Sequence, residues 1–319
     1  MSALKLQLCE AGKLEENEVD YWLVGSVYNL CFWVKGNRLY IYLPVSNTSV
    51  AVVDSAGNYE IYSESCEGAG DLERVLRYTM GVYEDLGDFH RRALTDPLLS
   101  DFARVYRGWR LRSTSLWWSL VTATCQQNAS FKQGWRILHD IVRVYGKRVL
   151  VGGEEILRPP TPLEVLSDPE KLFATGAGFR AKTIINIAKA LVNGVVEPLY
   201  VEKAPVTDAE KTLRSIGGVG PYTARLALAL STRRYELPPI DKWLRRIVSA
   251  VYNVDERYVE ELWVEKWGKW SALASIAVTI TLDAEPLTNA LERIRRRELL
   301  PKPGFWPSPV NMVPFCTLT

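Results

Sequence analysis

The stretch at residues 213–246 constrains this chain more than any other, because a glycine turn lies there between two helical patterns. Gly218 and Gly220 flank a single valine, and Pro221 follows directly. Glycine tolerates backbone conformations that side chains forbid and lets a ligand approach closely, while proline suits the first position of a helix. The sequence therefore predicts two packed helices joined by a tight turn over residues 213–230. The free amides at the start of the second helix would favour an anion such as a phosphate.

A lone acid follows this turn. Asp241 comes directly after Pro238, Pro239 and Ile240, and it stands in an apolar helical pattern over 238–252. An aspartate before a helix is ordinarily an N-cap, because its carboxylate accepts hydrogen bonds from the first free amides. A turn that only binds phosphates has no need of a carboxylate, which phosphates repel. By itself, the position of Asp241 indicates an N-cap, a role that is compatible with a further one.

The turn and the acid together resemble the helix-hairpin-helix segment of the DNA glycosylase superfamily. That superfamily includes endonuclease III, the adenine-mismatch glycosylase, 8-oxoguanine DNA glycosylase and 3-methyladenine DNA glycosylase II. In those families an aspartate follows the hairpin at close to this distance, with an arginine five residues later, here Arg246. The resemblance implies that Asp241 is the catalytic carboxylate. It also implies a hairpin that holds the DNA backbone, formed by Gly218, Val219, Gly220 and Thr223.

Two further segments extend the resemblance over most of the chain. Tyr106 to Leu111 resembles the bridge from sheet to helices in 3-methyladenine and 8-oxoguanine glycosylases. Gly176 to Lys182 resembles the G-x-R-A-K stretch of 8-oxoguanine glycosylases, where it opens a helix. From this we expect further DNA contacts at Arg180, Lys182 and Arg246. Without the resemblance, the second segment is a helix start with basic residues on a solvated face.

The junction from Cys125 to Ser130 carries polar amides between two apolar helical patterns. By itself it indicates a solvated loop or a cap. In the families it resembles, this junction inserts a side chain into the hole left by the extruded nucleotide. The resemblance implies that Gln127 or Asn128 is this strand wedge.

The residues expected to line the base pocket are mainly aromatic: Tyr222, Trp243, Trp270 and the amide of Gln126. Tyr222 lies where bifunctional members of the superfamily carry a Schiff-base lysine, since 241 minus 222 is 19, the spacing that the resemblance implies. A phenol cannot form an imine, so we expect a monofunctional enzyme, with Lys242 or Lys182 as the alternative nucleophile. The helical spacing of Trp270 from its neighbouring tryptophans is also typical of simple packing.

Residues 21 to 63 alternate apolar and polar residues, which predicts antiparallel strands at Tyr28–Val34, Leu39–Leu43, Val50–Asp54 and Tyr59–Ser63. After Gly70 the period changes to about 3.6 and the pattern stays helical. The predicted fold class is therefore α+β. An N-terminal antiparallel sheet domain with trailing helices (1–95) precedes a mainly α-helical, bilobed glycosylase domain (96–319), with the base pocket between its lobes.

Composition limits the cofactors and the surfaces. The formal net charge is +2, so a DNA-binding surface must come from local clustering of Lys and Arg. The five cysteines share no C-x-x-C spacing, and only Cys316 follows the Asp241 helix, unlike the four-cysteine endonuclease III branch. We expect no metal, no iron-sulfur cluster and no required cofactor; any cation would be a monovalent one bound by hairpin carbonyls. With no signal-like start and no membrane-length apolar stretch, we expect an intracellular protein of the cytoplasm or nucleoid.

The resemblance implies a base-excision-repair DNA glycosylase, a hydrolase of N-glycosyl bonds, acting on a flipped-out damaged purine. Its partner would be double-stranded DNA containing a damaged base, bound by a monomer with no membrane contact. Alkylated purines are favoured as substrates. One alternative is an 8-oxoguanine DNA glycosylase with or without abasic-site lyase activity. The other is a non-enzymatic helix-hairpin-helix DNA-binding protein.

Overall fold

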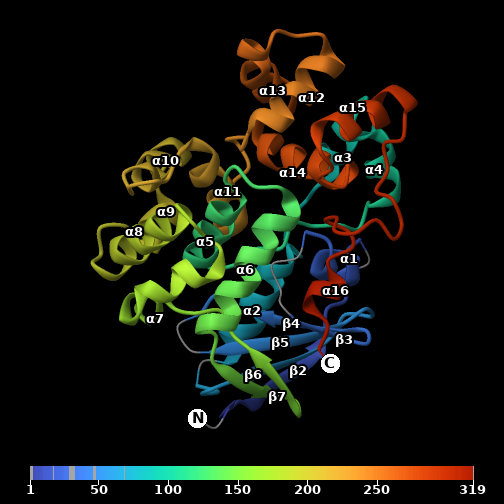
Figure 1. Cartoon of the computed structure of the whole chain (residues 1–319). Helices are drawn as coiled ribbons and strands as arrows, with labels where there is room; N and C mark the ends of the chain where they lie inside the picture. Colours follow the sequence, from blue (N-terminus) through green and yellow to red (C-terminus); the bar gives the residue numbers. More distant parts are fainter. Residues whose placement is uncertain (1–2, 17, 29–32, 46–47, 68, 319) are drawn as a thin grey trace.

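The computed structural model describes residues 3–16, 18–28, 33–45, 48–67 and 69–318 (Figure 1). The strands are β1 (Leu4–Lys5), β2 (Gln7–Lys13), β3 (Trp33–Lys35), β4 (Arg38–Tyr42), β5 (Ser49–Asp54), β6 (Asn58–Ser63), β7 (Arg148–Val151) and β8 (Glu154–Leu157). The α-helices are α1 (Tyr21–Ser26), α2 (Ala69–Met80), α3 (Gly87–Leu94), α4 (Ser100–Val105), α5 (Leu116–Gln126), α6 (Phe131–Tyr145), α7 (Pro162–Ser167), α8 (Arg180–Val192), α9 (Pro198–Lys203), α10 (Val206–Arg214), α11 (Pro221–Thr232), α12 (Lys242–Tyr252), α13 (Val259–Trp267), α14 (Ser271–Thr281), α15 (Leu287–Arg296) and α16 (Val313–Cys316). Short 3-10 helices are η1 (Pro169–Thr175), η2 (Glu256–Tyr258) and η3 (Gly268–Trp270).

The N-terminal sheet has the strand order β2-β6-β5-β4-β3, with every neighbouring pair antiparallel. The predicted strands at 39–43, 50–54 and 59–63 are confirmed within one residue at each end. The strand predicted from residue 28 is wrong at its start, because α1 and a turn occupy residues 21–28, and residues 29–32 lie outside the described parts. Alternation hid this short helix, whose first turn is capped by the Asp20 carboxylate accepting from Leu23 N.

A second, smaller sheet combines segments far apart in sequence. β1 runs parallel to β7, and β7 pairs antiparallel with β8. Apolar side chains of this sheet, such as Val149 and Ile156, pack against Val50 and Val52 of the large sheet. A disulfide joins Cys9 of β2 to Cys66, 57 residues further along. The sheet region is therefore completed by a hairpin from residues 148–157, well beyond the predicted boundary at 95.

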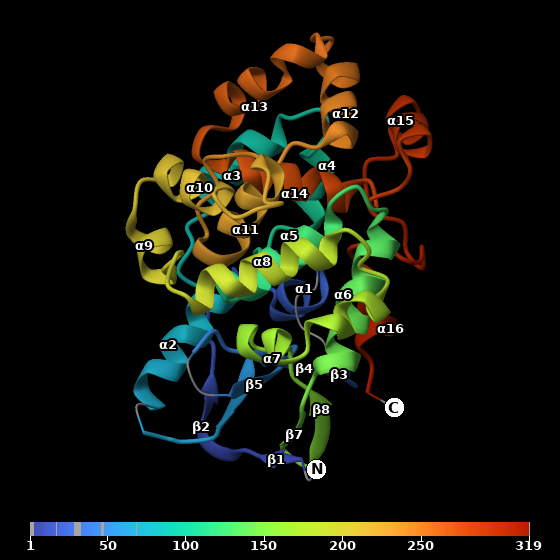
Figure 2. The same ribbon diagram turned by 60° about the vertical axis from the view of Figure 1, so that its left-hand side comes forward.

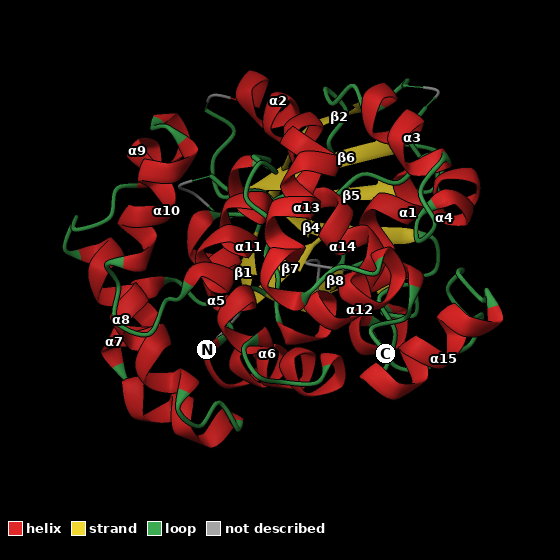
Figure 3. Ribbon diagram, turned by 90° about the horizontal axis from the view of Figure 1, so that it is seen from above, coloured by secondary structure: helices red, strands yellow, loops and turns green. Residues whose placement is uncertain are grey.

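The helical body surrounds α5, which is buried along almost its whole length. α5 packs against α6, α8 and α11, whereas α12, α13 and α15 form the opposite lobe with α14 beneath them (Figures 1 and 2). Seen from above, the helices cover the sheet like a second layer (Figure 3). This arrangement confirms the predicted α+β class. No helix in the described ranges is long and apolar enough to cross a bilayer.

The segment after α15 connects the two parts of the molecule. Arg293, which is buried, forms ion pairs with Asp283 (2.8 Å) and Glu285 (3.3 Å) and anchors the start of this segment. Further on, Pro309 O accepts a hydrogen bond from Tyr28 N (2.8 Å), and Leu318 N donates to Val34 O (2.9 Å). The sequence indicated no role for residues 301–319. In the structure, residues 301–318 run from the helical lobe back to the sheet.

Candidate active site

The hairpin between α10 and α11 is held from behind by α8 and the end of α5. Gly218 has a left-handed φ of +94°, and a Cβ there would lie 2.1 Å from Thr183 Oγ1. Asn186 Nδ2 donates to Gly217 O (3.0 Å), which fixes the turn against α8. Gly220 differs, because a Cβ at that position would meet nothing within 4 Å. The buried side of the turn is therefore filled by protein, while Gly220 leaves room for a ligand.

Asp241 caps α12, with its Oδ1 accepting from Leu244 N at 2.8 Å. The carboxylate is exposed to solvent, yet the surrounding protein withdraws enough water to raise its pKa, against the opposing effect of the backbone amides. Arg225 of α11 positions the preceding loop: its guanidinium donates to Pro238 O (3.3 Å) and pairs with Glu210 (2.8 Å) and Glu260 (2.7 Å). The hairpin helix and the catalytic candidate are therefore mechanically linked.

Two tyrosines accompany this carboxylate. Burial raises the pKa of Tyr222 well above its ordinary value, with further contributions from Tyr28 and then Asp241. The pKa of Tyr28 is likewise raised, by burial first and by Asp241 second. The Tyr28 ring contacts Phe131 and Trp135 of α6, with ring centroids 6.4 and 6.2 Å apart. The structure therefore brings a sheet-domain residue to the site.

Sequence reasoning missed Tyr28 because it placed this residue in a strand. Its φ is 49°, a left-handed conformation that bulky side chains seldom adopt outside functional or strained positions. No periodicity in the sequence could have revealed this conformation.

No family model matches the chain. Two curated relatives share weak but extended similarity. The probable N-glycosylase/DNA lyase of Methanothermobacter thermautotrophicus is 25% identical over 222 residues, covering 62% of this chain and 70% of the relative. The DNA-3-methyladenine glycosylase of Bacillus subtilis is 24% identical over 271 residues, covering 82% and 88%.

A solved structure extends the comparison to the fold. The 8-oxoguanine glycosylase/lyase of Clostridium acetobutylicum, in complex with double-stranded DNA containing cytosine opposite 8-oxoguanine, superposes with a TM-score of 0.67. It is 18% identical, with 91% of this chain and 99% of that chain covered. This chain has the fold of the helix-hairpin-helix DNA glycosylases.

Within this glycosylase fold, the predicted hairpin residues separate into two groups. Val219 and Thr223 have buried side chains, so only their backbone could contact DNA. Thr223 Oγ1 accepts from Gln127 Nε2 (2.5 Å), which also donates to Gly218 O (3.2 Å). In this structure the Gln127 amide therefore holds the hairpin, and its predicted role as a strand wedge stays a prediction. Asn128 is exposed with a φ of 45°, and its wedge role stays a prediction.

Arg180 also has a different role from the predicted one. Only 4% of it is exposed, and its guanidinium donates to Gln127 O (3.0 Å) and Asn128 O (3.1 Å). A direct DNA contact does not fit this buried side chain, which instead supports the junction carrying Asn128. Lys182 and Arg246 are exposed, and their DNA contacts stay predictions.

Two tryptophans that we expected in the base pocket form contacts within the protein. Trp270 Nε1 donates to Asp88 Oδ2 (2.9 Å), and its ring stacks on Tyr235 at 6.2 Å. It is 7% exposed, so the prediction of a base-pocket role is wrong, and packing explains the pattern. Trp243 is half-buried in the first turn of α12, with Nε1 donating to Glu285 O (2.8 Å).

Gln126 is half-buried against α6, where a Cβ at Gly134 would come within 2.7 Å of its amide. Its Nε2 is buried and has no hydrogen-bond partner among the described residues. Because Phe131 and Trp135 on the same helix contact Tyr28, this amide remains a candidate for the pocket.

The hairpin carbonyls at 217 and 218 already accept side-chain amides. Binding of a monovalent cation by other hairpin carbonyls stays a prediction. Within the described ranges, no group of three or more His, Cys, Asp or Glu residues could hold a metal ion.

Proposed function

We propose that this protein is a base-excision DNA glycosylase that hydrolyses the N-glycosidic bond of a flipped-out damaged purine. One observation carries the proposal: Asp241, an exposed residue, caps α12, and Arg225 of the helix that follows the open Gly220 turn holds the loop just before it. A phosphate-binding device alone would place no acid there, because phosphates repel it. The similarity to curated N-glycosylases over much of the chain supports the same conclusion.

The chemistry follows from the two halves of the site. The hairpin would hold the backbone while the target nucleotide leaves the stack, at a cost of roughly a few kcal/mol that is smallest for a weakly paired base. Breaking the bond to the sugar develops positive charge on the deoxyribose. Asp241, whose Oδ1 is held by Leu244 N, would stabilise that cation and orient a water.

The substrate we favour is an alkylated purine. Tyr28 and Tyr222 give the surroundings of Asp241 an aromatic character, which suits stacking on a base whose sugar bond is already weakened. A second candidate is 8-oxoguanine, and the observation that favours it is the unpartnered amide of Gln126. A buried polar group that bonds the correct base rejects an analogue lacking that bond far better than an apolar pocket does.

A panel of duplexes, each with one lesion, tests both candidates against Asp241→Asn as the inactive control. We expect release of 3-methyladenine and 7-methylguanine before 8-oxoguanine. Rapid release of 8-oxoguanine with intact methylated bases would reverse the order. Specific binding with no release of any base would leave a non-enzymatic DNA-binding protein.

Tyr222 leads us to propose a monofunctional enzyme. A phenol forms no imine with the sugar, and the nearby Lys242 is at the first position of α12, on the exposed surface. Borohydride treatment during turnover should therefore trap little covalent protein-DNA adduct. Efficient trapping that disappears in Lys242→Gln or Lys182→Gln would identify the amine and establish a lyase.

A further inference from the structure

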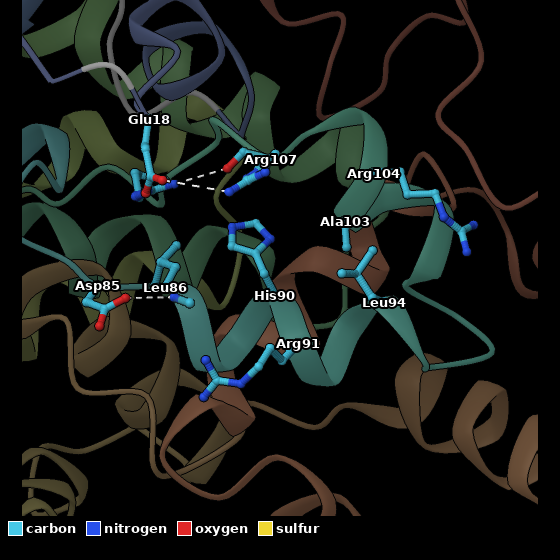
Figure 4. Close-up of a pocket in the computed structure, with 11 residues that line it drawn as sticks. Glu18, Asp85, Leu86, His90, Arg91, Leu94, Ala103, Arg104 and Arg107 are labelled. Carbon is cyan, nitrogen blue, oxygen red and sulfur yellow. Dashed lines mark hydrogen bonds and ion pairs between the residues drawn. The ribbon is translucent and has the colours of Figure 1, made fainter.

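A cavity of about 540 Å³ lies between α3, α4 and the segment that follows α4 (Figure 4). Its walls include Glu18 from the sheet domain, His90 of α3, and Arg107 and Arg110 beyond α4. None of the residues assigned to the candidate active site lines it. The cavity is therefore a separate feature of the molecule.

Arg110 is an unusual buried cation in this wall. It is only 4% exposed, and its recorded hydrogen bonds go to the carbonyl oxygens of Arg107 (3.2 Å) and Trp109 (3.0 Å). Its Nε has no partner, and no carboxylate of the described chain lies within ion-pair distance. Leaving a buried charge without a counter-ion is strongly unfavourable.

A second buried arginine provides the contrast. Arg233 lies close to Arg110, since both flank Gly81. Its guanidinium pairs with Glu84 at 2.7 Å and donates to Tyr78 O and Thr79 O. Among the described residues, only one of these two guanidinium groups therefore forms an ion pair with a carboxylate, whereas Glu84 and Glu18 act on Arg110 from beyond ion-pair distance.

His90 adds a second unsatisfied group. Both of its ring nitrogens are buried without a hydrogen-bond partner in the described structure. The ring lies in the middle of the cavity, close to Arg107 (Figure 4). Arg107 is itself held weakly, by a 3.7 Å contact to Glu18 in which both side chains are 76% exposed. Arg110, His90 and Arg107 thus line one cavity and form few hydrogen bonds or ion pairs within the described protein.

We propose that this cavity binds a small phosphate-bearing ligand, with the phosphate held by Arg110, Arg107 and His90. Arginine forks match the geometry of phosphate oxygens, and a donor from His90 would add a third contact. The volume exceeds that of a bare phosphate, and Leu94 and Ala103 supply an apolar wall for an organic group. We therefore expect a phosphomonoester such as a nucleoside monophosphate to bind more tightly than inorganic phosphate.

The position of the cavity gives such binding a structural effect. Asp20 N donates to Gly108 O (2.9 Å), so the loop before α1 already rests on the segment after α4. A ligand held by Arg107 lies beside this contact and would stabilise the sheet domain against the helices.

Histidine NMR provides a direct test, because the chain contains only His90 and His139. His139 is buried beside Cys316 and serves as the internal control. We would titrate protein carrying labelled histidine with inorganic phosphate and with deoxyadenosine monophosphate, at constant ionic strength kept with chloride. Saturable movement of the His90 signal, with His139 unchanged and the nucleotide binding more tightly, is the expected result. His90→Gln assigns the two signals.

Arg110→Met removes the buried charge and should weaken binding by about tenfold or more. Arg74→Met, at an exposed arginine paired with Asp71, is the matched control and should bind as the wild type does. If Arg110→Met does not fold, Arg107→Met takes its place. Three results would each overturn the proposal: no movement of His90 at about 50 mM ligand, far above typical metabolite affinities; equal binding by the arginine variants and wild type; or loss of binding on addition of undamaged duplex, which would place the phosphate on the DNA-binding surface.

Discussion

Asp241 combines two demands in one side chain. As an N-cap it contributes roughly 1 kcal/mol to helix stability, and as an exposed carboxylate it is free to face a sugar. Removing its charge should separate these roles, because asparagine is an equally good cap.

We therefore expect Asp241→Asn to keep the free energy of unfolding within about 1 kcal/mol of the wild type. Its excision rate should fall by about a hundredfold or more, because the developing cation loses its counter-charge. Single-turnover base release measures the rate, and fluorescence anisotropy with the same duplex measures binding. Wild-type excision by a folded Asp241→Asn would contradict the assignment.

The raised pKa of Asp241 gives a second prediction. Because the protein around the carboxylate disfavours its charged form, this group stabilises the fold at low pH and loses that contribution as pH rises through its folded pKa, above the ordinary 3.8. The excision rate should depend on pH in the opposite direction, since the carboxylate must be ionised to act. The excision rate should thus fall at acidic pH, and the fall should begin at a higher pH than the titration of a free aspartate. The residual activity of Asp241→Asn should not show this acidic fall. If the wild type and Asp241→Asn both lose activity at the same acidic pH, the loss would be due to another titrating group.

Some of these residues could be identified from sequence and others could not. Asp241 and the two glycines were predicted from their spacing along the chain, and the structure places them at the start of α12 and in the turn before α11. Gln127, Arg180 and Trp270 had suitable chemistry, but the direction of a side chain depends on what packs beside it. The groups that determine these directions come from other elements: Thr223 for Gln127, the Gln127 carbonyl for Arg180, and Asp88 for Trp270.

At the scale of elements, the hairpin is a turn with one packed side and one open side. Gly218 needs its left-handed φ and has Thr183 against it, whereas Gly220 has neither constraint. The two glycines, indistinguishable in the sequence, therefore differ in the structure: the turn requires Gly218, whereas the space beside Gly220 is open.

Substitution by alanine should separate them. Gly218→Ala should lower the free energy of unfolding by about 1–3 kcal/mol, through backbone strain and contact with Thr183. Gly220→Ala should leave the free energy of unfolding nearly unchanged. It should weaken the binding of damaged and undamaged duplexes equally, because a contact to the DNA backbone does not depend on the base. Thermal unfolding and anisotropy with both duplexes measure this. If Gly220→Ala weakened the binding of damaged duplex alone, the turn would contact the damaged base instead of the DNA backbone.

The strands show how far the sequence pattern could predict whole elements. Alternation located β4, β5 and β6, because one buried face imposes a period of two. It missed α1, which is too short for a helical period to emerge, and it missed the β1-β7-β8 sheet, whose pairing joins segments about 145 residues apart.

At the scale of the whole molecule, the sheet is joined to itself by Cys9–Cys66 and to the helices by residues 297–318. A disulfide that closes a loop of this length stabilises mainly by restricting the unfolded chain. It lies on β2 and after β6, among none of the residues proposed for catalysis.

Replacing both cysteines, as Cys9→Ser with Cys66→Ser, should lower the free energy of unfolding by up to about 4 kcal/mol. The excision rate of the folded protein should be unchanged. Denaturant unfolding of both proteins, with and without reductant, measures the difference, and reductant should affect the wild type alone. Equal stability of the two proteins without reductant would show that the bridge contributes nothing.

The hydrogen bond from Tyr28 to Pro309 also has a consequence for the order of events during synthesis. Tyr28 leaves the ribosome early, whereas its acceptor emerges 281 residues later, after the hairpin and Asp241. A nascent chain that has reached Arg297 already carries the acid, the glycine turn and the α6 rings that contact Tyr28, yet it lacks the carbonyl that accepts from Tyr28 N. This contact is therefore made last, by a residue outside the candidate site, and we expect a single proteolytic cut between 298 and 308 to weaken it from a distance.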